Sequence, residues 1–150
     1  MQTEGSVEID APIDDVFRLT TEHVAEWSIV VVEDEVIEEK PGHIGTTFRS
    51  VTEDHGKRME FDGVVTVNEP PTFHEAELTG KYFDLKAAYT FEDLSGRTRV
   101  TQTSVVFPKG LMKAFFFLCG WMMNKANCDA IDKELNSLKQ FCENQTAVVV

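Results

Sequence analysis

The stretch Ser6-Val-Glu-Ile-Asp-Ala-Pro-Ile-Asp-Asp-Val-Phe17 decides how the chain begins to fold. Its first residues alternate between apolar and acidic side chains, which is typical of a short strand with one buried face. Pro12 then stands where a helix can begin, because the first helical turn does not need the amide hydrogen that proline lacks. We therefore predict a strand, a short helix on the inward residues Ile13, Val16, Phe17 and Thr20, and a second short helix that Thr21 caps and that ends near Trp27.

The other end of the chain predicts one long helix, from about Leu111 to Glu143. In its second half the apolar positions step by three and four, while the charged positions Asp129, Lys133, Glu134 and Lys139 lie off that stripe. This pattern is typical of an amphipathic helix on a sheet, with Cys128, Ile131, Leu135, Leu138 and Cys142 facing inward. The first half, Leu111–Met123, is apolar nearly all round and is interrupted by Gly120.

Strands fill the chain between these ends. Six segments carry strand patterns and are separated by turns rich in glycine and proline: Val30–Glu39, Gly45–Glu53, Lys57–Glu69, Thr72–Thr79, Tyr82–Asp93 and Thr98–Phe107. Connections this short predict antiparallel pairing. We expect a single α+β domain over residues 1–145, with a flexible tail at 146–150, in which the long helix covers the sheet and encloses a pocket.

Charge and cysteine placement limit the possible partners. The 26 acidic residues outnumber the 14 basic ones, and a net charge of −12 opposes binding to nucleic acid and to anionic lipid. The N-terminus lacks the basic and apolar regions of a signal peptide, and the three cysteines lie too far apart on the last helix to pair, so we expect a reducing cytoplasm. The histidines and cysteines lack metal-ligand spacing, so we expect no metal and no cofactor.

Three places in the chain resemble the helix-grip superfamily. They are Val7–Phe17 with Trp27 after it, Val67-Asn-Glu-Pro-Pro71 before a strand, and Gly96-Arg-Thr-Arg-Val-Thr101 with the closing helix. This superfamily includes START-like lipid-transfer domains, polyketide cyclase/dehydrase-like (SRPBCC) proteins and plant pollen allergens. The resemblance covers residues 5–143 and implies a curved antiparallel sheet of about six to seven strands around a long C-terminal helix. It brings no invariant catalytic set, so the catalytic residues stay unknown.

Aromatic and inward polar residues are the candidate ligand contacts. Gln102 and Ser104 are in phase with apolar Val100 and Val106, and His74 is in phase with Ala76 and Leu78. If these faces are concave, the polar side chains point into the pocket and need a partner there. The candidate ligand-binding set is Trp27, Phe48, Phe61, His74, Phe83, Tyr89, Gln102, Ser104, Trp121 and Asn124.

We expect a binding or carrier protein for a small hydrophobic molecule, such as a lipid, a polyketide or a quinone. One alternative is an enzyme of the cyclase or dehydratase type, for which His74, Tyr89 or an inward Asp or Glu are the candidate acids or bases. A second alternative is a co-chaperone-like interaction module. The oligomeric state stays open.

The apolar segment Leu111–Met123 has two interpretations. It is buried on both sides, or it forms an exposed portal that faces lipid or a partner. Its length is too short to span a bilayer, which takes about 20 residues. We expect this segment to be a movable wall of the pocket rather than a membrane anchor, because Pro108, Gly110 and Gly120 give the chain places to bend.

Overall fold

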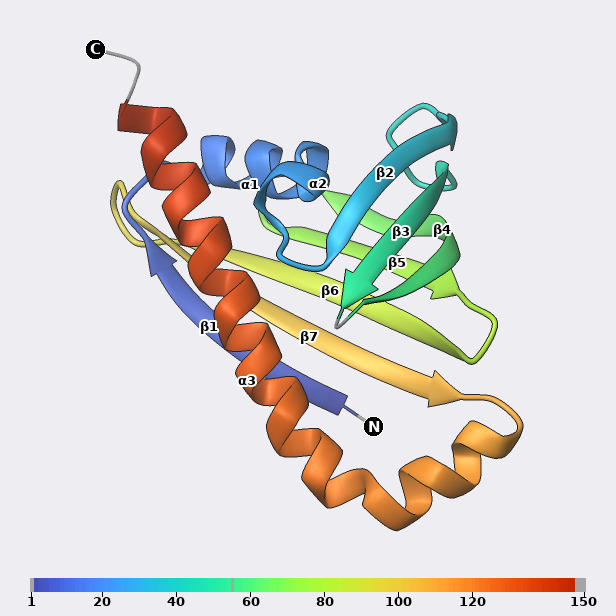
Figure 1. Cartoon of the computed structure of the whole chain (residues 1–150). Helices are drawn as coiled ribbons and strands as arrows, with labels where there is room; N and C mark the ends of the chain where they lie inside the picture. Colours follow the sequence, from blue (N-terminus) through green and yellow to red (C-terminus); the bar gives the residue numbers. More distant parts are fainter. Residues whose placement is uncertain (1, 55, 148–150) are drawn as a thin grey trace.

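The computed structural model describes residues 2–54 and 56–147, and of residues 116, 119–127 and 147 it describes the backbone alone. Seven strands form one antiparallel sheet in the order β1-β7-β6-β5-β4-β3-β2, and α3 runs along it (Figure 1). The predicted α+β helix-grip class is confirmed. The elements are β1 (Gln2–Ile9), α1 (Ile13–Glu22), α2 (Val24–Trp27), β2 (Val31–Glu38), β3 (Thr47–Asp54), β4 (Lys57–Glu69), β5 (Phe73–Thr79), β6 (Phe83–Asp93), β7 (Thr98–Pro108) and α3 (Leu111–Ala147).

Most strand ends differ from the prediction by one or two residues, and three predictions about element ends differ further from the structure. β1 begins at Gln2, because it pairs with β7 along its whole length and the ladder holds polar residues in the strand. Thr21 does not cap α2, because it lies inside α1 and its hydroxyl donates to the carbonyl of Phe17 at 3.0 Å. α3 continues to Ala147 instead of ending near Glu143, so residues 146 and 147 of the predicted tail are helical. Residues 148–150 lie outside the described chain.

One face of the sheet meets α3 and is concave in Figure 1. The strand register places Val7, Val100 and Phe91 opposite one another on this face, and all three pack in the main core. Gly5, on the same face of β1, lets α3 approach closely, because a Cβ there would collide with Ile131 and lie 3.2 Å from Leu135 Cδ1.

The main core closes one end of this concave face. Side chains from α1, α2 and the second half of α3 pack there against β1, β6 and β7: Ile9, Ala11, Val16, Phe17, Leu19, Trp27, Phe91, Val100, Ile131, Leu135, Leu138 and Cys142. The predicted inward stripe of α3 is therefore confirmed at the four positions Ile131, Leu135, Leu138 and Cys142. Burial of this stripe fixes the second half of the helix on the sheet.

The first turns of α3 leave the sheet, and the helix bends before it returns to cross β1 (Figure 1). Leu111, Phe117 and Leu118 are 92%, 89% and 73% exposed. The interpretation that this segment is buried on both sides is therefore wrong for its described side chains. α1 and α2 lie over the opposite end of the sheet, so they cannot cover it.

Candidate functional site

The concave face carries a row of polar side chains between apolar ones. Cross-strand pairing places Gln102 opposite Tyr89, and Tyr89 opposite His74, across β7, β6 and β5. Ser104 lies opposite Ala87 one step farther from the main core. These four predicted residues share the face that α3 borders, so the register brings together groups that are distant in the sequence.

Gln102 is the residue with an unmet hydrogen-bonding need. Its Oε1 is buried and accepts no hydrogen bond from the described part of the chain. Its neighbours across the ladders are Gly5, which has no side chain, and Tyr89. Buried polar atoms in folded proteins nearly always have a partner, so this oxygen is a candidate acceptor for a ligand hydroxyl or amide.

Tyr89 contacts aromatic rings of the main core. Its ring meets Trp27 edge-on, with ring centroids 6.5 Å apart, and lies 6.4 Å from Phe91 in a stacked arrangement. Burial raises the pKa of the Tyr89 phenol well above its ordinary value, and the nearby Glu134 carboxylate adds to the shift. The phenol therefore stays protonated and can donate a hydrogen bond but cannot act as a base.

His74 is held in one orientation. Its Nδ1 lies 3.0 Å from Asn68 Oδ1, while the Asn68 amide donates to the Gly42 carbonyl. Because Asn68 Oδ1 can only accept, neutral His74 carries its proton on Nδ1, and Nε2 holds the lone pair of the ring. Burial, and to a smaller extent repulsion by His43, lowers the pKa of His74 to about 4. The ring is therefore neutral at pH 7.

Glu134 is a half-buried carboxylate that sequence reasoning placed on the solvent side of α3. It accepts hydrogen bonds from the Ser28 hydroxyl at 2.9 Å and from the Ile29 amide at 2.7 Å, and so ties the loop between α2 and β2 to the helix. Ser137 adds a second tie by donating to the Trp27 carbonyl. Burial raises the pKa of Glu134, and the hydrogen bonds from this loop oppose the shift. In the sequence, Glu134 is a charged residue next to the apolar stripe of α3, and nothing in that pattern predicts its hydrogen bonds to this loop.

Aromatic side chains line the other part of the concave face. The Phe48 ring lies on Gly63, whose missing Cβ leaves the necessary space. Phe61 and Phe83 meet with ring centroids 5.5 Å apart, and a Cβ on Gly80 would lie only 2.5 Å from the Phe61 ring. All of these aromatic rings lie on the same face as Gln102 by register.

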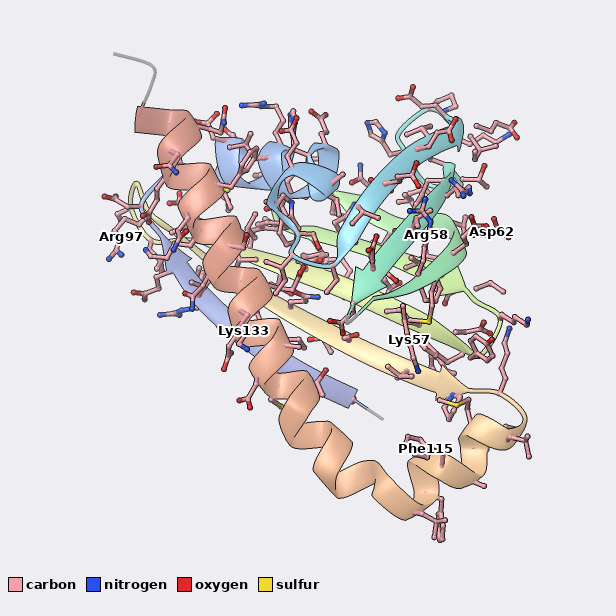
Figure 2. All side chains as sticks on the ribbon, in the orientation of Figure 1. Lys57, Arg58, Asp62, Arg97, Phe115 and Lys133 are labelled. Carbon is pink, nitrogen blue, oxygen red and sulfur yellow. The ribbon has the colours of Figure 1, made fainter. Side chains whose placement is uncertain are left out.

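A cavity of about 470 Å³ lies at the rim of this face, between β4 and the turn before β6. Phe61 and Phe83 belong to its lining, together with Arg49, Arg58, Met59, Glu60, Asp62, Lys81 and Tyr82. Figure 2 shows Arg58 and Asp62 on the β3–β4 side of the molecule, away from α3. This cavity opens at the rim, and the pocket predicted between the sheet and the C-terminal helix stays a prediction.

The structure does not bring every predicted residue to the concave row. Trp27 lies in the main core, where its indole donates to the Thr20 carbonyl at 3.1 Å, so its polar atom already has a partner. The side chains of Trp121 and Asn124 lie outside the described residues. Among the side chains that the structure describes, no group of three or more His, Cys, Asp or Glu residues gathers to hold a metal ion. No described helix is both long and apolar enough to cross a membrane.

Comparison with known proteins gives a family and a fold. A family model described as polyketide cyclase / dehydrase and lipid transport matches residues 1–143. No curated protein matches the chain by sequence.

Several solved structures are similar to this one. A protein of Thermus thermophilus has a TM-score of 0.81 at 17% identity, over 100% of both chains. The ZhuI aromatase/cyclase of a Streptomyces species has a TM-score of 0.78 at 15% identity, over 97% of this chain and 95% of its own. A START superfamily protein of Mycobacterium smegmatis has a TM-score of 0.79 at 14% identity, over 96% and 98%. At these identities the likeness extends to the fold alone.

Proposed function

Since this chain belongs to the polyketide cyclase / dehydrase and lipid-transport family, we propose that it binds and carries a small hydrophobic molecule on the concave face of its sheet. The observation that carries the proposal is the buried Oε1 of Gln102, which has no hydrogen-bond partner among the described residues. The same face carries half-buried apolar or small side chains, such as Leu85, Ala87 and Val106. Binding sites for small molecules combine such an apolar surface with a few placed polar groups.

The polar row indicates the chemistry of the ligand. Gln102 Oε1 needs a donor, Tyr89 offers a phenolic hydrogen, and His74 Nε2 offers a lone pair. None of these groups is charged at pH 7, so they suit a neutral molecule that has hydroxyl and carbonyl groups on an apolar skeleton. A hydroxylated lipid, a polyketide or a quinol has this pattern. The free thiols Cys128 and Cys142 support a reducing cytoplasmic location for such a carrier.

Native mass spectrometry of the protein purified from its own host tests the proposal. We expect a copurified small molecule that is lost on mild activation, and reduced occupancy in the Gln102→Leu variant. The outward-facing Thr103→Val variant, on the same strand, serves as the control and keeps its occupancy. A protein that carries nothing, and that also fails to bind the apolar fluorophore N-phenyl-1-naphthylamine, contradicts the proposal.

A second candidate function, a cyclase or dehydratase reaction, is favoured by the pairing of His74 with Tyr89 across β5 and β6. His74 Nε2 would accept a proton from a carbon next to a carbonyl, and Tyr89 would donate a hydrogen bond to the resulting oxyanion. The pKa of about 4 makes His74 a weak base, which is why binding is the first proposal. Turnover of a polyketide-like substrate that His74→Gln abolishes, with ligand affinity unchanged, would favour the enzyme.

A further inference from the structure

One end of the molecule carries several exposed apolar side chains. Leu111, Phe117 and Leu118 are almost bare on the first turns of α3. Exposed Tyr82 and Phe107 lie near the start of this helix, because the Lys109 amide donates to the Tyr82 carbonyl at 3.0 Å. In Figure 2, Phe115 lies on this same segment, at the opposite end of α3 from the C-terminus. Contiguous exposed apolar surface of this kind marks a contact site.

The base of this segment is fixed. Lys109 Nζ donates to the Gly80 carbonyl at 2.9 Å and lies 2.8 Å from Asp84 Oδ1, so the chain before α3 is tied to the turn before β6. Gly110 then takes a positive φ of 56°, which redirects the chain into the helix. The fold therefore holds the apolar turns out from the sheet.

Charge separates this end from the remainder of the protein. The chain carries a net charge of −12, yet no acidic residue occurs between Asp93 and Asp129. The exposed end carries Lys81 and Lys113, and also Lys109, whose ammonium group pairs with the Asp84 carboxylate. Their long stems can lie in an apolar layer while their ammonium groups reach phosphates. If this end enters a lipid interface, none of the residues from 94 to 128 brings a carboxylate with it.

The exposed side chains point in several directions. Phe117 and Leu118 are adjacent on the helix and so project about 100° apart. A rigid protein surface covers one face of a helix, whereas lipid chains close around a segment from several sides. A second copy of this chain is also disfavoured, because two molecules with a charge of −12 repel each other.

We propose that this apolar end, made of Leu111, Phe117, Leu118, Tyr82 and Phe107, inserts into the surface of a zwitterionic lipid membrane. The insertion is interfacial and reversible, because the apolar segment is too short to span a bilayer. A zwitterionic surface is named because an anionic one repels the acidic body of the protein. This proposal goes beyond ligand binding, and its test does not depend on Gln102 or on the ligand.

Flotation with phosphatidylcholine vesicles tests the proposal. We expect the wild-type chain to float with the vesicles and the double variant Phe117→Gln, Leu118→Gln to lose at least tenfold in partition, since burial of each side chain is worth about that factor. Both substitutions lie on exposed helical positions, so the fold is retained, and circular dichroism checks this. The control is Ile37→Gln, which removes an exposed apolar side chain from β2 and leaves partition unchanged.

Three results would overturn the proposal. They are a wild-type chain that does not float, a double variant that floats as well as wild type, and size-exclusion profiles in which wild type forms a dimer that the double variant loses. A failure of ligand binding in Gln102→Leu with normal flotation would contradict the proposed function alone.

Discussion

Replacement of Gln102 by leucine tests whether the concave face is built for a polar ligand group. The substitution nearly conserves volume and removes the buried Oε1 that has no partner among the described residues. An unmet buried polar group costs about 1–3 kcal/mol. The ligand-free variant should therefore be more stable than wild type by about 1–2 kcal/mol, which for a chain of this length raises Tm by roughly 2–4 °C per kcal/mol.

Urea denaturation of the ligand-free protein measures this change in the free energy of unfolding. The same substitution should weaken binding of the copurified ligand about two- to tenfold, the worth of one hydrogen bond. Stability and affinity thus move in opposite directions, which a merely structural role would not produce. The reasoning is refuted if Gln102→Leu lowers stability by about 1 kcal/mol or more, because Oε1 would then have a partner within the fold.

Three further predictions concern the helix and the buried histidine. Gly5→Ala should cost about 1–3 kcal/mol in urea denaturation, because its Cβ meets Ile131 and pushes α3 from β1, while the outward-facing Ser6→Ala should cost little. His74 has a folded pKa of about 4 against an ordinary 6.5, so the unfolded chain binds the proton first as pH falls. The contribution of neutral His74 to the free energy of unfolding is complete above pH 6.5 and should fall by about 2 kcal/mol on going to pH 4.5. The His74→Phe variant should lack this loss. A variant with the same pH profile as wild type would contradict the prediction. Hydrogen exchange should be faster in residues 111–123 than in 128–142, because the first turns of α3 stand away from the sheet; equal protection of the two segments would contradict this.

Much of the fold follows from local patterns. The alternation on β6, the 3-4 stripe of α3 and the proline and glycine turns each predict an element that the structure contains, with ends shifted by a few residues. Short connections then limit the strands to antiparallel neighbours. The inward phase of Gln102 also followed from its spacing to Val100, which is buried in the main core.

The candidate site was harder to predict, because it depends on register and on contacts between distant segments. From the sequence, Trp27 and Tyr89 were both aromatic candidates for ligand binding. In the structure, however, the Trp27 indole already donates a hydrogen bond to the Thr20 carbonyl inside the core. Glu134 is polar and off the apolar stripe, so its sequence position indicates solvent. The loop at Ser28 and Ile29 comes from more than a hundred residues away to bury it, and no local pattern encodes that meeting.

By itself the sequence determined the class of the protein: a strand-rich sheet, a long amphipathic helix and an uncharged polar row on an apolar face. These features depend on side-chain periodicity, which is a local property of the chain. The tertiary structure alone decided that Gln102 has no partner in the described chain, that Glu134 has several, and that the first turns of α3 lie outside the core. Those outcomes depend on which residues remain to cover a given surface once the sheet has curved and the second half of α3 has docked.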